Sequence, residues 1–117
     1  MSETTPHPKK GLALVTGASR GIGAAIAEQL AKQGFHVLIN FLSNEAKAQE
    51  VASRIAAAGG SAELLRFDVA NESEISAAFE IISKKDAPLE VLVNNAGISE
   101  DGLVLRLKKA TLDRSEE

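Results

Sequence analysis

A turn with three glycines that joins an apolar run directly to a helical pattern restricts the fold of this chain more than any other feature. Leu12 to Thr16 is a short apolar run, which is typical of a buried strand. The turn occupies residues 16–23, and from Ile22 onward apolar residues recur at helical spacing until Gly34 ends the helix. A strand that turns through glycines straight into a helix is the opening of a βαβ unit.

The same alternation of apolar runs and helical patterns continues along the chain. A helix is expected at Glu45–Ala58, and another from Asn71, where a Glu follows three residues later. Further strands are expected at Val37–Ile39, Ala62–Phe67 and Leu89–Val93, and Leu103–Leu107 is expected to begin one more helix. Helices between successive strands favour parallel pairing. We therefore predict an α/β fold: a Rossmann-type parallel sheet with helices on both faces, truncated after about four strands.

Length and composition indicate one domain and exclude several kinds of partner. Of the 117 residues, 1–9 are expected to form a disordered tail and 10–117 a nucleotide-binding domain that is incomplete at its C-terminal end. The net charge of -3 argues against a nucleic-acid or anionic membrane surface. No cysteine is present for a disulfide or thiolate metal site, and no apolar run approaches the roughly 18 residues of a membrane span. We expect a cytoplasmic protein without a metal.

The glycine turn has the chemistry that a pyrophosphate requires. Backbone N–H groups at a helix N-terminus attract negative charge, and glycine allows the chain and the ligand to approach closely. The spacing is G-x-x-x-G-x-G, and no Lys-Ser or Lys-Thr follows it, so the alternative phosphate loop is absent. Glycines also serve tight turns for purely structural reasons, but the position between strand and helix in the first βαβ unit favours nucleotide binding.

Three motifs together resemble the short-chain dehydrogenase/reductase family. They are the Thr-Gly-x-x-x-Gly-x-Gly turn, Asn94-Asn95-Ala96-Gly97 after the fourth expected strand, and Asp68-Val69 after the third. The resemblance extends from about Lys10 to Arg114. It implies that the turn holds the pyrophosphate, that Asp68 accepts a hydrogen bond from adenine, and that residues 95–97 pass beneath the nicotinamide ribose. Asn94 is expected to tie neighbouring strands together. The implied cofactor-binding residues are Gly17, Ser19, Arg20, Gly21, Ile22, Gly23, Asp68, Val69, Asn95, Ala96 and Gly97.

The residues after the second expected strand favour NADP over NAD. A carboxylate at this point binds the ribose 2′-hydroxyl of NAD and repels a 2′-phosphate. The stretch is Asn40-Phe41-Leu42-Ser43-Asn44, and the first acid, Glu45, already belongs to the next helix. We predict that Asn40, Leu42 and Ser43 line this pocket, with Asn40 and Ser43 donating to the phosphate. Arg20 either reaches the same phosphate with its guanidinium or is a solvated surface residue.

The segment from Ile98 to Lys109 resembles 3-oxoacyl-[acyl-carrier-protein] reductases, a subfamily that docks an acidic carrier protein. This resemblance implies reduction of a 3-oxoacyl thioester by NADPH in fatty-acid synthesis, and a homo-oligomer for the full-length family member. Arg106, Lys108 and Lys109 are the basic residues expected to meet the carrier; the alternative is an ordinary solvated helix start.

Catalysis in the resembled family uses an Asn, a Ser and a Tyr-x-x-x-Lys pair, and this chain contains no Tyr. A positioned proton donor typically accelerates such a step by about 10²–10⁴-fold. We therefore assign no catalytic residue and expect no useful turnover from the chain alone. Three hypotheses stay open: the cofactor-binding front part of an NADPH-dependent reductase, a stand-alone NADP-binding module, or one half of a split reductase.

Overall fold

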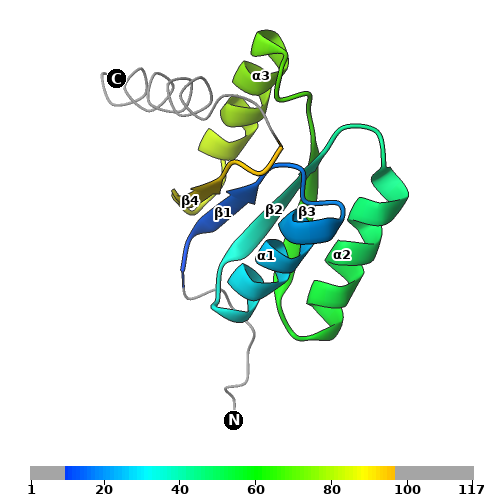
Figure 1. The fold of residues 1–117 in the computed structure, drawn as a ribbon. Helices are drawn as coiled ribbons and strands as arrows, with labels where there is room; N and C mark the ends of the chain where they lie inside the picture. Colours follow the sequence, from blue (N-terminus) through cyan, green and yellow to red (C-terminus); the bar gives the residue numbers. More distant parts are fainter. Residues whose placement is uncertain (1–9, 97–117) are drawn as a thin grey trace.

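The computed structural model describes residues 10–96 of the chain. Four strands alternate with three helices (Figure 1): β1 (Leu12–Val15), α1 (Gly21–Lys32), β2 (His36–Phe41), α2 (Glu45–Ala57), β3 (Ser61–Arg66), α3 (Glu72–Ser83) and β4 (Leu89–Val93). These elements match the predicted ones to within a few residues at each end. The tail expected at residues 1–9 and the helix expected from Leu103 lie outside the described residues.

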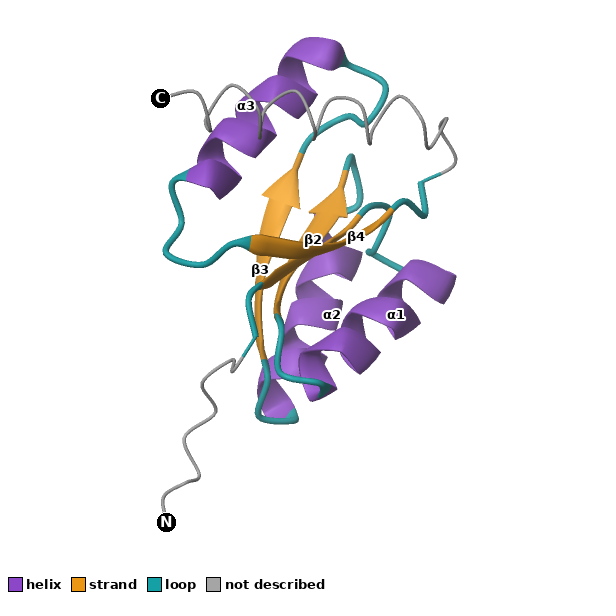
Figure 2. Cartoon of the chain, turned by 90° about the vertical axis from the view of Figure 1, so that its left-hand side faces the viewer, coloured by secondary structure: helices purple, strands orange, loops and turns teal. Residues whose placement is uncertain are grey.

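The four strands form one parallel sheet in the order β3-β2-β1-β4. Seen along the sheet, α1 and α2 cover one face and α3 covers the other (Figure 2). Val37 and Ile39 of β2 pack toward α1 and α2, whereas Leu38 between them packs with Phe79 of α3. The central strands are thus buried on both faces, which explains their unbroken apolar sequence. The predicted fold, a Rossmann-type sheet with helices on both faces, is confirmed.

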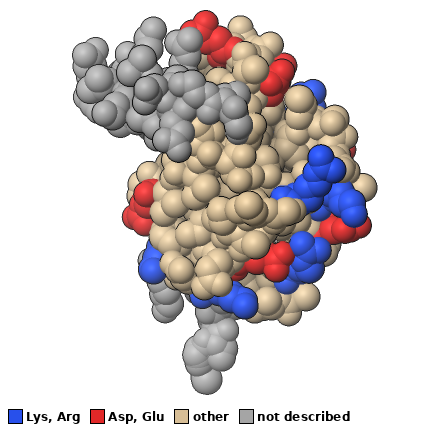
Figure 3. Space-filling model, in the orientation of Figure 1, with Lys and Arg blue, Asp and Glu red and all other residues tan. Residues whose placement is uncertain are grey.

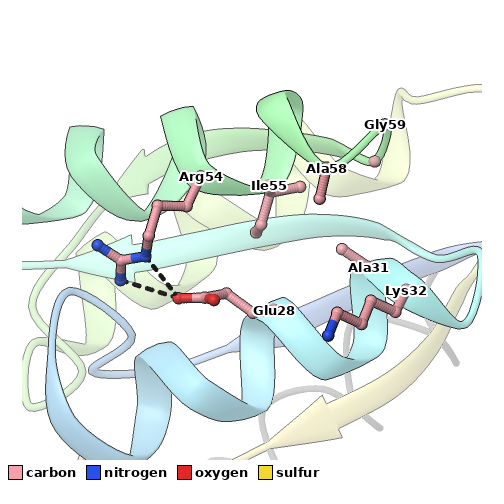
Figure 4. Close-up of a pocket in the computed structure, with 8 residues that line it drawn as sticks. Glu28, Ala31, Lys32, Arg54, Ile55, Ala58 and Gly59 are labelled. Atoms are coloured by element: carbon pink, nitrogen blue, oxygen red, sulfur yellow. Dashed lines mark hydrogen bonds and ion pairs between the residues drawn. The ribbon is translucent and has the colours of Figure 1, made fainter.

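The two helices on the same face share one apolar core and are joined by an ion pair. Ala31 of α1 faces Ile55 of α2, and Glu28 Oε2 lies 2.8 Å from Arg54 Nη2 (Figure 4). An exposed pair of this kind contributes little to stability, so apolar contact is the main force that holds α1 against α2. Positive and negative side chains are interspersed on the face shown in Figure 3. No helix within residues 10–96 is long and apolar enough to cross a membrane.

The strand order fixes the place where a ligand can bind. The chain runs from β1 outward through β2 to β3 and then returns to place β4 on the other side of β1. The helices that follow β1 and β3, α1 and α3, therefore lie on opposite faces of the sheet. In open α/β sheets, ligands bind in the crevice that opens at such a point.

Candidate cofactor site

Thr16, directly after β1, is bonded to the segment that follows β4 at the carboxyl edge of the sheet. Its side chain is fully buried at the end of β1, and its Oγ1 accepts hydrogen bonds from the backbone N–H groups of Asn95 (2.8 Å) and Ala96 (3.1 Å). The hydroxyl can donate to Val93 O or to Asn94 Oδ1, each 3.3 Å away. The contact with Asn94 agrees with its expected role in tying neighbouring strands. The sequence places Thr16 at the end of the strand and in the glycine turn, but it did not predict this role.

Asn40 is a second buried polar residue at this edge, with an exposed fraction of 2%. Its Oδ1 accepts from Gly17 N (3.0 Å), and its Nδ2 donates to the carbonyl oxygens of Leu65 (3.3 Å) and Phe67 (2.9 Å). The prediction that Asn40 donates to a 2′-phosphate is therefore corrected. The amide points inward because β2 lies between β1 and β3. Its hydrogen bonds go to backbone groups that follow β1 and to groups at the end of β3.

The glycine turn packs tightly at one position and is open at another. A Cβ on Gly23 would lie 2.4 Å from Gly17 O and 2.6 Å from Asn95 Nδ2, so only glycine fits there. Asn95 Nδ2 itself donates to Gly17 O at 3.1 Å. Gly21 has φ of +63°, a left-handed conformation that favours glycine, and a Cβ there would meet nothing within 4 Å. The space over Gly21 is thus free for a ligand.

The N-terminus of α1 differs from that of the other two helices. Asn44 and Asn71 cap α2 and α3 with side-chain hydrogen bonds, and both helices carry an acid in the first turn. Helix α1 has Arg20 at the N-cap, no side-chain cap and no acid in its first turn. The first N–H groups of a helix need partners and attract anions. An uncapped helix start next to a glycine turn is the arrangement that holds a phosphate.

Several predicted cofactor residues are accessible around this helix start. Arg20 and Ser43 are exposed, and Ser19 is half-buried. Ile22 and Leu42 are large apolar residues that nevertheless expose 73% and 45% of their surface. The carboxyl edge of the sheet therefore offers apolar contact for the rings of a dinucleotide as well as polar donors for its phosphates.

A side chain of α3 holds the loop after β3. Asp68 N donates to Glu74 Oε1 (2.8 Å), and Asp68 Oδ1 accepts from Ala70 N (2.9 Å), which orients the carboxylate. Asn71 caps α3 through Glu74 N as predicted, but the Glu74 carboxylate reaches Asp68 and not the cap residue. Asp68 and Val69 are both half-buried at the carboxyl edge. The role of Glu74 in holding Asp68 was not predicted.

Asn95 and Ala96 lie against the turn, as their contacts with Thr16 and Gly17 show. Gly97, Arg106, Lys108 and Lys109 lie outside the described residues. A separate hollow lies between the C-terminal ends of α1 and α2, around Ala31, Arg54 and Gly59 (Figure 4). It contains none of the predicted cofactor residues. Among residues 10–96, no three His, Cys, Asp or Glu side chains are grouped to hold a metal ion.

Comparison with known proteins agrees with this geometry. The family model described as short chain dehydrogenase matches residues 11–116. The chain is 43% identical over 101 residues to a 3-oxoacyl-[acyl-carrier-protein] reductase of Staphylococcus aureus, covering 86% of this chain and 41% of that protein. It is 49% identical over 87 residues to the oxidoreductase YgfF of Escherichia coli, covering 74% of this chain and 35% of that protein. The chain thus spans well under half the length of these relatives.

Two solved structures are similar in fold and sequence. A metagenomic short-chain oxidoreductase in complex with NADP gives a TM-score of 0.70 at 40% identity, covering 80% of this chain and 41% of that one. A dehydrogenase/reductase from Sinorhizobium meliloti gives a TM-score of 0.71 at 40% identity, covering 81% of this chain and 38% of that one.

Proposed function

The chain belongs to the short-chain dehydrogenase family, and from this we propose that it binds NADPH at the carboxyl edge of its sheet. The observation that carries the proposal is the uncapped N-terminus of α1 beside the open space over Gly21. An anion placed there satisfies helix N–H groups that Asn44 and Asn71 satisfy in the other two helices. The NADP complex of the metagenomic relative supports the same choice of ligand.

We assign the parts of the cofactor to three connections. The pyrophosphate meets the first N–H groups of α1, with Ser19 and Arg20 beside the adenosine ribose. The Asp68 carboxylate, oriented by Ala70 N, accepts from the adenine amino group. Asn95 and Ala96, held by Thr16, support the nicotinamide ribose. Asn40 is proposed to support the site without touching the cofactor. The full proposed set of contacting residues is Gly17, Ser19, Arg20, Gly21, Ile22, Gly23, Leu42, Ser43, Asp68, Val69, Asn95, Ala96 and Gly97.

The preference for NADPH over NADH rests on charge. No carboxylate occurs from Asn40 to Asn44, so nothing there repels a 2′-phosphate. Exposed Ser43 can donate to that phosphate, and Arg20 brings a permanent positive charge with several donors. Because the Asn40 side chain points inward, we assign the preference for NADPH over NADH to Arg20 and Ser43.

For the reaction, we propose reduction of a 3-oxoacyl thioester to the 3-hydroxyacyl form in fatty-acid synthesis. The name of the Staphylococcus aureus relative, 3-oxoacyl-[acyl-carrier-protein] reductase, supports the substrate class. Bound NADPH would supply the hydride. The new alkoxide then needs a proton, and this chain has no Tyr to donate one. We therefore propose that the chain holds the cofactor and does not turn over by itself. A carrier protein would dock at Arg106, Lys108 and Lys109, and the complete enzyme would be a homo-oligomer.

The absence of Tyr is equally compatible with a second candidate, in which the chain is an NADP-binding module or one half of a split reductase. A mixing experiment separates the two forms. Turnover of a 3-oxoacyl thioester that appears only with a second polypeptide carrying Tyr-x-x-x-Lys would favour the split reductase over the module.

A fluorescence titration tests the proposed function directly. The purified chain is titrated with NADPH and NADH, following the fluorescence of the reduced nicotinamide. We expect saturable binding, with NADPH bound at least about tenfold more tightly, which corresponds to about 1.4 kcal/mol for one added phosphate contact. Lack of binding by a chain that circular dichroism shows to be folded would contradict the proposal, and equal affinities would contradict the role of Arg20 and Ser43.

A further inference from the structure

Asn40 connects two segments that the proposed cofactor must bridge. Its Oδ1 holds Gly17 N at the start of the glycine turn, and its Nδ2 holds Phe67 O, directly before Asp68. The first segment meets the pyrophosphate and the second meets the adenine. We infer that Asn40 is a positioning residue that sets the separation of these two segments before a ligand arrives. The inference rests on the proposed cofactor site.

An apolar side chain at position 40 could not make the hydrogen bonds of Asn40. The residue is almost fully buried and sits in β2, between β1 and β3. One end of its side chain must accept and the other must donate, and an amide does both. Asparagine is disfavoured in strands, so strand formation does not account for its presence. The hydrogen bonds of its side chain to Gly17 N and Phe67 O account for it.

The bridge reaches three of the connections at the carboxyl edge, those that follow β1, β3 and β4. Ala18 N donates to the Asn40 backbone carbonyl (2.9 Å), which adds a second attachment of the turn to β2. With its N–H held by Asn40, Gly17 presents its own carbonyl to Asn95 Nδ2. The loops after β1, β3 and β4 are therefore linked through Gly17 and Asn40. A site held in this way loses less conformational freedom when it binds a ligand.

Amide hydrogen exchange without cofactor tests the bridge, and NADPH titration tests its consequence. In Asn40→Ala, we expect Gly17 N–H to exchange about tenfold faster relative to the Val51 amide, which lies inside α2 and reports global opening. The dissociation constant for NADPH should rise by about tenfold in the folded variant, because two hydrogen bonds that order the site are gone.

Asn40→Thr separates positioning from stability. A β-branched residue suits a strand, so this variant is expected to fold even if Asn40→Ala does not. Its hydroxyl is one bond shorter than the amide and cannot hold both neighbours. We expect unchanged protection of the Val51 amide together with faster Gly17 exchange and weaker NADPH binding.

Val51→Ala is the matched control, because it removes buried volume from the core without touching the turn. It should lower global stability and leave the NADPH dissociation constant unchanged in the folded chain. Unchanged Gly17 exchange relative to Val51 in both Asn40 variants would overturn the inference. Failure of the unaltered chain to bind NADPH would instead contradict the proposed function, since the exchange experiment uses no cofactor.

Discussion

At the residue scale, buried polar side chains shape this site more than apolar ones do. Thr16 accepts from two backbone N–H groups, those of Asn95 and Ala96. We expect Thr16→Val, which keeps the side-chain shape, to lower the free energy of unfolding by about 2 kcal/mol, since both groups lose their acceptor. Urea denaturation measures this change. Thr16→Ser keeps the hydroxyl and should cost clearly less; unchanged stability in Thr16→Val would mean that the hydroxyl contributes nothing.

Gly21 and Gly59 form a matched pair for testing the turn. Both have positive φ, +63° and +90°, and a Cβ on either would meet nothing within 4 Å. Alanine at either position should therefore cost a similar amount of stability, about 1–2 kcal/mol of backbone strain. Only Gly21→Ala places a methyl group where the pyrophosphate is proposed to lie. We expect it to weaken NADPH binding at least about tenfold, while Gly59→Ala leaves the affinity unchanged. Equal affinities would place the ligand elsewhere.

At the scale of the element, the N-terminus of α1 has no side-chain cap. This should lower the stability of the protein when no cofactor is bound. Arg20→Asp supplies a capping acceptor and a favourable charge, and should raise the free energy of unfolding by about 1 kcal/mol. The same carboxylate competes with the pyrophosphate for the helix N–H groups, and the positive charge of Arg20 is lost beside the proposed 2′-phosphate. NADPH affinity should therefore fall about tenfold or more.

Thermal unfolding and the fluorescence titration on the same Arg20→Asp sample give the two values. Asn71→Asp, which replaces one capping residue by another in α3, is the control for added negative charge. A gain in stability without any loss of affinity would argue against an anion at the start of α1.

Periodicity predicted the elements well because each depends on local sequence. Asn71 was recognised as a cap from its spacing to Glu74, and β4 was placed at its observed bounds. The inward turn of the Asn40 amide was not predictable in this way. It depends on β1 and β3 lying on either side of β2, which is a property of the whole sheet. The reach of Glu74 to Asp68 N likewise depends on how the loop after β3 folds back.

On the scale of the whole molecule, the two edges of the sheet have different roles. The carboxyl edge carries the proposed cofactor site. The amino edge carries a network in which His36 contacts Ser61 Oγ through Nδ1 and Glu63 Oε1 through Nε2 (2.8 Å), while Lys85 Nζ lies 2.8 Å from Glu63 Oε2. This network ties β2 to β3 and both to the turn before β4. It should therefore contribute to stability and not to binding.

The Glu63 carboxyl should make the contribution of this network to stability depend on pH. Burial alone would raise its pKa, but the side-chain hydrogen bonds and charges of Lys85 and His36 outweigh burial and hold the pKa below its ordinary value of 4.5. A carboxyl with a lowered folded-state pKa stabilises the protein above the unfolded pKa, and this stabilisation is lost as pH falls through the folded value.

Glu63→Gln should accordingly lower the melting temperature at neutral pH, by an amount limited by the partial exposure of the side chain. The difference from the unaltered chain should shrink below pH 4.5 and vanish once the native carboxyl is protonated. Thermal unfolding by circular dichroism across this range measures the difference, and NADPH affinity at neutral pH should stay unchanged because the cofactor is proposed to bind at the opposite edge. A stability difference that persists unchanged in strong acid would show that it does not come from the charge of Glu63. A loss of affinity would show that the two edges are coupled through β2, which carries His36 at one end and Asn40 near the other.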